Sequence, residues 1–98
     1  MNVKLALLAT LEAKEGKGGE LGDFLRAGRE LAVTEKGTVT WYAFRIDENR
    51  YGIFDTFETE DARAAHLGGP IAEALGKVAG DLLAAEPSIQ PVDVIAAK

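Results

Sequence analysis

The stretch that decides the fold is YGIFDTFETEDARAAHLGGP, residues 51–70. Its first part, Tyr51 to Glu58, has the composition and alternation of a β-strand. Thr59 suits a helix N-cap, because its hydroxyl can accept a hydrogen bond from a free N–H of the first turn. The helix that follows ends at Gly68-Gly69, and Pro70 suits the first turn of a second helix. The stretch therefore predicts a strand, a capped helix and the start of another helix.

The rest of the chain supplies the remaining elements of one fold. Strands are predicted at Val3–Lys14, Thr38–Ile46 and Ser88–Ala97, and longer helices at Glu20–Glu35 and Pro70–Ala85. The turn at residues 47–50 joins two strands into a hairpin, with Asn49 suited to a left-handed conformation. The order strand, helix, strand, strand, helix pair, strand predicts a ferredoxin-like α+β fold. Its four-stranded antiparallel sheet would carry helices on one face.

Length and composition exclude several classes of function. The 98 residues are enough for a single domain, residues 1–98. A net charge of -5, without clustered basic residues, argues against nucleic acid as a partner. Without cysteine and with a single histidine, neither disulfides nor a protein-held metal are expected. No apolar run approaches the roughly 20 residues of a membrane helix, and no signal peptide is recognised, so we expect a cytoplasmic protein without membrane contact.

Large apolar side chains alternate on both faces of the predicted hairpin. Trp41 and Ala43 fall on one face, and Tyr42 and Phe44 fall on the other. Helices on one side would leave the other face uncovered, and exposed apolar patches usually mark interfaces. The pattern favours a homodimer that stacks its two sheets. The alternative is that loops or the chain ends cover this face.

Two polar residues are the candidates for chemistry. His66 is the only histidine and has the ordinary pKa of a general base, although a histidine near a helix C-terminus can simply interact with the last carbonyls. Asp55 is a carboxylate within an otherwise apolar strand and could orient the imidazole or contact a substrate. An ion pair of Asp55 with Arg45 or Arg63 is the simpler alternative.

The aromatic residues are candidates for the wall of a substrate pocket, although core packing is the better explanation for each one taken alone. Alternation places Asp55 and Phe57 on one face. One register of the hairpin adds Tyr42 and Phe44 to that face and turns Trp41 toward the dimer partner; a slip of one residue exchanges the two sets. We favour Tyr42 in the pocket. The candidate substrate-binding residues are Tyr42, Phe57, Phe44, Phe24 and Trp41, of which Phe24 comes from the first helix.

Residues 41–75, WYAFRIDENRYGIFDTFETEDARAAHLGGPIAEAL, resemble the antibiotic biosynthesis monooxygenase family, including its small quinol-monooxygenase-like members. The motif is an acidic residue two before an aromatic, then a capped helix with a histidine near its end: Asp55, Phe57 and His66. The resemblance implies a dimeric α+β barrel with a pocket between helices and sheet in each subunit. It also implies oxygenation of a hydroxyaromatic or quinol without flavin, haem or metal.

The resemblance thus implies a cofactor-independent monooxygenase acting on a small aromatic molecule. A base would remove a proton from the substrate, and apolar walls would keep water away. Haem-degrading relatives use an asparagine of the first strand, where this chain has only Asn2, and many members have tryptophan where Phe57 stands. Two alternatives are a non-catalytic dimer that binds a small ligand and a structural dimer whose pocket is filled.

Overall fold

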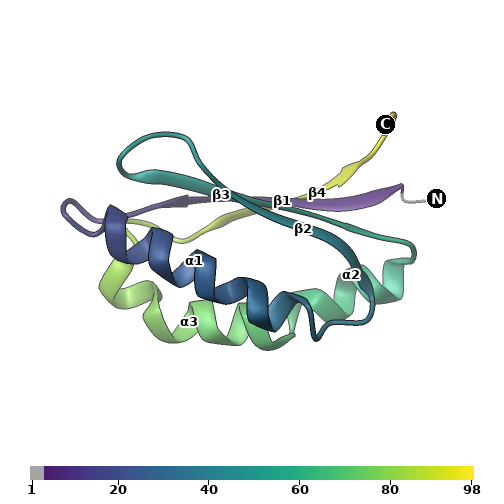
Figure 1. Cartoon of the computed structure of the whole chain (residues 1–98), viewed down its shortest axis with the longest axis horizontal. Coiled ribbons are helices and arrows are strands. Elements are labelled where there is room, and N and C mark those ends of the chain that lie inside the picture. Colours follow the sequence, from purple (N-terminus) through teal and green to yellow (C-terminus); the bar gives the residue numbers. More distant parts are fainter. Residues whose placement is uncertain (1–3) are drawn as a thin grey trace.

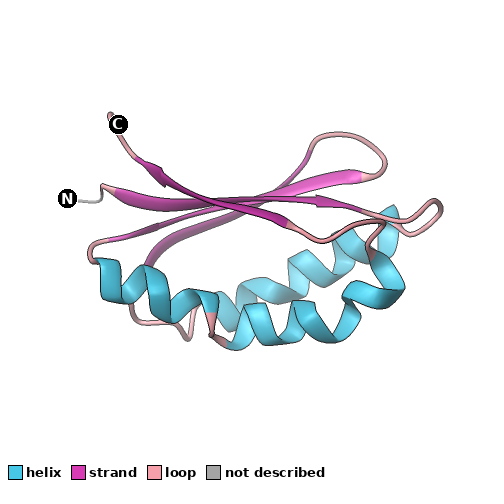
Figure 2. Ribbon diagram, turned by 180° about the vertical axis from the view of Figure 1, so that it is seen from behind, coloured by secondary structure: helices cyan, strands magenta, loops and turns pink. Residues whose placement is uncertain are grey.

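The computed structural model describes residues 4–98, which form one sheet with helices on a single face (Figure 1). All neighbouring strands are antiparallel, in the order β2-β3-β1-β4. The strands are β1 (Leu5–Glu12), β2 (Thr38–Arg45), β3 (Arg50–Phe57) and β4 (Ser88–Asp93). The helices are α1 (Gly18–Ala32), α2 (Glu60–Leu67) and α3 (Pro70–Leu82), and the view from behind shows the same two layers (Figure 2). The predicted ferredoxin-like fold is confirmed.

The ends of several elements differ from the prediction. Helix α1 ends at Ala32 instead of Glu35, because the next residues form a turn in which the Glu35 N–H donates to the Ala32 carbonyl. Helix α3 ends at Leu82 because Leu83 is extended and pairs with Ala13. Strand β4 ends at Asp93. The predicted strand start at Val3 lies outside the described residues, as does Asn2.

Local signals around α2 and α3 act as expected. The Thr59 side chain accepts a hydrogen bond from the Ala62 N–H at 3.1 Å, which confirms the predicted N-cap. Pro70 occupies the first turn of α3.

No helix within residues 4–98 has the length and apolar character needed to cross a bilayer.

The main core lies between the sheet and helices α1 and α3. Its buried members come from β1, β3, both helices and the segments that follow them: Leu11, Ala13, Leu21, Leu25, Tyr51, Ile53, Leu75, Leu82 and Leu83. Phe24 is partly buried and packs against this cluster. Burial of such side chains contributes about 1.5–3 kcal/mol each, so this layer dominates the stability of the fold.

The register of the β2–β3 hairpin is the opposite of the one we favoured. Trp41 pairs with Asp55, while Tyr42 pairs with Phe54, so Trp41 shares the helix-covered face with Asp55. Trp41 packs against the core, and Tyr42 lies on the uncovered face with 59% of its surface exposed. The prediction that Tyr42 faces the pocket and Trp41 the partner is therefore wrong.

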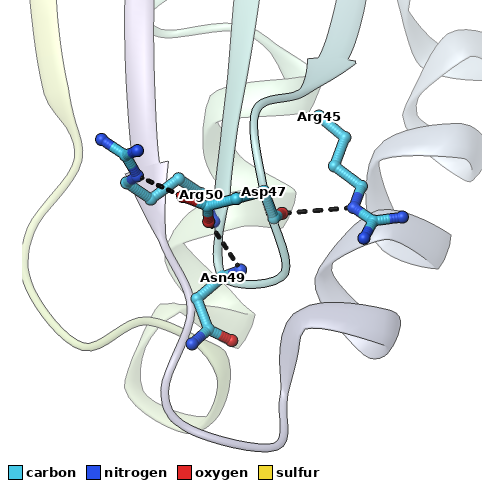
Figure 3. Close-up of polar contacts among 4 residues, drawn as sticks. All are labelled: Arg45, Asp47, Asn49 and Arg50. Atoms are coloured by element: carbon cyan, nitrogen blue, oxygen red, sulfur yellow. Dashed lines mark hydrogen bonds and ion pairs between the residues drawn. The ribbon is translucent and has the colours of Figure 1, made fainter.

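The turn between β2 and β3 explains why this register could not be read from residue types (Figure 3). Asp47 Oδ1 accepts the N–H groups of Asn49 and Arg50 at 3.0 and 2.9 Å, and Asp47 Oδ2 accepts Arg50 Nε at 2.8 Å. The side-chain bond from Arg50, then the Asn49 N–H, hold the pKa of Asp47 below its usual value. Because the carboxylate closes the turn, no left-handed residue is needed. The expectation for Asn49 is wrong, since no non-glycine residue within 4–98 has a positive φ.

The start of α1 packs tightly against this turn and gives a test of the fold. A Cβ at Gly18 would overlap the backbone carbonyl of Glu48, whereas a Cβ at Gly19 would meet nothing within 4 Å. We expect Gly18→Ala to lower the free energy of unfolding by about 1–3 kcal/mol through overpacking. Gly19→Ala, the matched control in the same helix turn, should be neutral or stabilising. Urea unfolding of both variants measures this, and equal stabilities would contradict the packing described.

Candidate functional site

A cavity of about 210 Å³ opens between the sheet and helices α2 and α3. Its walls are almost entirely aliphatic, and its polar side chains are Asp55 and His66. The other lining residues are Leu7, Ala9, Ile53, Leu67, Ile71, Ala72, Leu75, Gly76, Ala79, Pro87 and Ile89. The space beside the predicted catalytic pair is therefore not filled by the protein's own side chains.

His66 lies between two carboxylates at the polar end of this cavity. Its Nε2 lies 2.8 Å from Asp55 Oδ2, and its Nδ1 lies 2.5 Å from Glu35 Oε1. All three side chains are buried, with exposed fractions of 11% for His66, 2% for Asp55 and 10% for Glu35. The structure thus brings together the two residues predicted to act as a pair and adds a third.

Each member of this cluster comes from a different element. Asp55 points to the helix side of β3, opposite Leu7 of β1, and His66 comes from the last turn of α2. The Phe57 ring is fully buried, and its centroid lies 5.3 Å from that of the imidazole, so the two rings pack against one another. Glu35 belongs to the loop between α1 and β2.

The loop that carries Glu35 approaches α2 closely. A Cβ at Gly37 would come within 2.8 Å of the Ala62 Cβ, a distance that a real side chain would not tolerate. Thr38 Oγ1 donates to Glu35 Oε1 at 2.9 Å, which fixes the carboxylate that also contacts His66. A small residue at position 37 is therefore a condition for the Glu35–His66 contact.

The surroundings of His66 determine its charge. Burial by itself would lower the pKa of His66, but the hydrogen bonds and charges of Asp55 and Glu35 outweigh burial and raise this pKa to about 9. His66 is therefore an imidazolium at neutral pH. A general base needs a free lone pair, so the expectation of a pKa near neutrality is not met.

Two oxygen atoms of the cluster lack a full set of partners. Glu35 Oε2 and Asp55 Oδ2 are buried without an aligned hydrogen bond from any described residue. Asp55 Oδ2 is close enough to His66 Nε2 for an ion pair, but the oxygen is not in line with the N–H. Since buried acceptors are normally satisfied, the Asp55 oxygen at the cavity wall retains the capacity to accept from a ligand.

The simpler explanation for Asp55 is wrong. Arg45 donates its Nε to the Asp47 carbonyl at 3.2 Å. Arg63 binds the carboxylate of Glu60 and the carbonyls of Ala6 and Val92. Neither arginine pairs with Asp55. Glu35 was missed by the sequence reasoning, because it lies 31 residues from His66 and the helix was expected to continue through it.

The aromatic residues proposed as substrate contacts do not join this cavity. Trp41, Tyr42 and Phe44 line a separate groove of about 720 Å³ between α1 and β2, together with Arg26, Arg29 and Arg45. Phe57 is buried behind His66, and Phe24 lines neither hollow. The groove and the cavity are separate because β2 is the edge strand of the sheet, whereas the cavity lies over β3, β1 and β4. The hairpin register also turns Tyr42 and Phe44 away from the face that carries Asp55.

Comparison with known proteins places the chain in a family. No protein-family model and no curated protein matches it. Among solved structures, the NE2512 protein of unknown function from Nitrosomonas europaea is 44% identical, with a TM-score of 0.97 over 99% of this chain and 94% of that one.

The chain belongs to the NE2512 family.

More distant structures share the fold of this family. A protein from Nitrosomonas europaea named "Putative antibiotic biosynthesis monooxygenase" has a TM-score of 0.83 at 15% identity, covering 94% of this chain and 99% of that one. A second protein with that name, from Caulobacter crescentus CB15, has a TM-score of 0.79 at 22% identity, covering 97% and 92%. The resemblance is confirmed at the level of fold: the NE2512 family has an antibiotic biosynthesis monooxygenase-like fold.

Within residues 4–98, no group of three or more histidine, cysteine, aspartate or glutamate side chains is arranged to hold a metal ion. In the Glu35–His66–Asp55 cluster both imidazole nitrogens are already occupied by carboxylates.

The raised pKa of His66 predicts how stability changes with pH. Between the ordinary value of 6.5 and about 9, the folded chain keeps a proton that the unfolded chain releases. We therefore expect the contribution of His66 to the free energy of unfolding to be largest below pH 6.5 and to fall by about 3 kcal/mol as the pH rises to 9.

Urea unfolding at half-unit pH steps measures this loss. Repeating the series in 0.5 M NaCl is the control, since salt screens surface repulsion strongly but a buried pair weakly. A stability that stays constant or increases between pH 6.5 and 9 would show that His66 is not held as a cation.

Proposed function

We propose that this chain is a cofactor-independent monooxygenase that acts on a small hydroxyaromatic or quinol in the cavity beside Asp55 and His66. The observation that carries the proposal is the placement of one buried ionic pair at the end of an otherwise aliphatic cavity. A volume of about 210 Å³ is below the roughly 300 Å³ of sites for drug-sized ligands, so a one-ring substrate fits best. A cytoplasmic location remains part of this proposal.

The reaction that we propose uses the substrate itself as the reductant. A hydroquinone and dioxygen give a hydroxyquinone and water, so one oxygen atom enters the ring and the other leaves as water. The substrate supplies all four electrons. The task of the protein is to remove the hydroxyl proton, stabilise the resulting anion and keep water out of the cavity.

The charges of the site assign these tasks differently from our first expectation. Because His66 holds a proton at neutral pH, Asp55 is the group that can accept the hydroxyl proton of the substrate. The imidazolium lies beside the same position and would stabilise the substrate oxyanion by its charge. The aliphatic wall, with Leu7, Ile53 and Leu75, would limit access of water.

A binding protein without turnover is the second candidate. The observation that favours it is the cationic state of His66, which removes the conventional base from the site. The same cavity would then hold a small aromatic ligand through one hydrogen bond to Asp55 and apolar contacts.

Oxygen consumption with a panel of hydroquinones and anthrones tests the proposal. We expect the one-ring hydroquinones to be consumed, and Asp55→Asn to lower the rate by about 100-fold or more, because the amide cannot accept the proton. Asp81→Asn, on the exposed side of α3, is the control and should keep the wild-type rate. Unchanged turnover in Asp55→Asn would contradict the assignment. Binding without oxygen uptake would support the second candidate.

The proposed unit of function is a homodimer formed through the uncovered sheet face. This face carries a contiguous apolar set from all four strands: Leu8, Tyr42, Phe44, Phe54 and Val92. Tyr42 and Phe44 expose 59% and 38% of their surfaces. A patch of this kind supports an interface between copies, because burial of the two faces against one another removes it from water.

Sedimentation velocity at micromolar concentration tests the dimer. We expect a dimer for the wild type and a monomer for Tyr42→Glu, since each copy would bury an unpaired carboxylate in the interface. Val33→Glu is the control, because Val33 is 62% exposed but lies on the helix side, at the end of α1. A wild-type monomer, or an unaltered dimer in Tyr42→Glu, would contradict the proposed interface.

A further inference from the structure

Glu35 differs from the other two members of the buried cluster in its relation to the cavity. Asp55 and His66 line the cavity, whereas Glu35 does not and reaches only the far nitrogen of the imidazole. Its side chain is nevertheless 90% buried, at 10% exposure, in a loop that is otherwise at the surface. A buried carboxylate that contacts no cavity and no arginine or lysine needs a reason.

Hydrogen-bonding rules fix the protonation of the ring. An ionised carboxylate only accepts, so Nδ1 must donate to Glu35 at 2.5 Å. On the other side, Nε2 lies 2.8 Å from Asp55, which is also an acceptor. A neutral imidazole carries one N–H and could satisfy only one of these neighbours. An imidazolium carries an N–H on each nitrogen and so matches a hydrogen bond to Glu35 on one side and an ion pair with Asp55 on the other.

The other charged groups of the surrounding elements do not neutralise the carboxylates of Glu35 and Asp55. On α2, Arg63 is bound by Glu60 and by backbone carbonyls, and Asp61 is exposed. Next to Glu35, Lys36 is exposed. On α3, the ion pair of Lys77 with Glu73 is also exposed. The cluster of two carboxylates and one imidazolium therefore carries a net negative charge.

The loop is built to hold Glu35 in this place. Thr38 donates to the same oxygen that meets His66, and the close approach of Gly37 to Ala62 leaves room for no larger residue. Two independent contacts thus fix the carboxylate. Because Glu35 occupies the Nδ1 side of the ring, Asp55 is left at the cavity wall with one oxygen that accepts no aligned hydrogen bond.

We propose that Glu35 is a positioning residue of the site: it holds His66 as an imidazolium through Nδ1, with Nε2 beside Asp55, and so leaves Asp55 as the carboxylate that faces the ligand. The benefit for turnover rests on the proposed function, but the assignment of Glu35 to His66 does not. Glu35 touches no ligand in this arrangement and acts only through the ring.

The single histidine makes a direct test possible, because its ring gives one set of side-chain signals in nitrogen-15 NMR. At pH 7.5 the wild-type ring should show both nitrogens protonated. In Glu35→Gln the midpoint of the His66 titration should fall by about one pH unit or more, since one of two neighbouring anions is removed. Glu30→Gln is the matched control: Glu30 is 80% exposed, and the midpoint should not move.

The outcomes separate this assignment from the proposed reaction. A neutral wild-type imidazole at pH 7.5 would overturn the assignment, and this measurement needs no variant to fold. An unchanged midpoint in a folded Glu35→Gln would overturn it as well, because a merely structural Glu35 would alter stability and leave the titration in place. Neither readout requires turnover, so the absence of oxygen uptake would count against the oxygenase alone.

Discussion

The buried pairing of one imidazolium with two carboxylates is the constraint on which the functional half of the structure depends. A buried charge is costly unless it is matched, and removal of one partner leaves the others unmatched. The cluster joins β3, α2 and the α1–β2 loop through Asp55, His66 and Glu35. These segments must therefore stay together for the site to exist, and the position of the small cavity follows from them.

Apolar packing governs the other half. Helices α1 and α3 close on β1 and β3 through an apolar core that contains no member of the ionic cluster. The cavity lies where this core gives way to α2, a helix that contributes no residue to the core. Space at that end is a consequence of a short and weakly apolar helix covering the sheet beside a well-packed layer. The protein thus combines a well-packed apolar core with a cavity whose wall is aliphatic except for Asp55 and His66.

Residue types within single helices and strands allowed the order of the elements to be predicted. They did not determine how strands pair or which residues distant in the sequence meet. The Thr59 cap and Pro70 act within one helical turn, so residue types were sufficient. The register of β2 depends on how the Asp47 carboxylate closes its turn, and alternating aromatics on both faces fit either register. His66 and Asp55 could be named because they are unusual in their segments. Glu35 could not, since nothing in its neighbourhood indicates that the loop returns to α2.

The two edges of the sheet are not equivalent, and this affects more than the site. Pro91 interrupts the β4 edge, where a missing N–H prevents a continuous ladder with an added strand. Strand β2 has eight residues, of which only Arg45 is charged, and its irregularity is confined to the pairing near Thr38 and Thr40. Foreign strands can therefore extend the sheet most readily along β2. Aggregation of a partly unfolded chain would begin at this edge, the strand whose first residue, Thr38, also holds Glu35 of the ionic cluster.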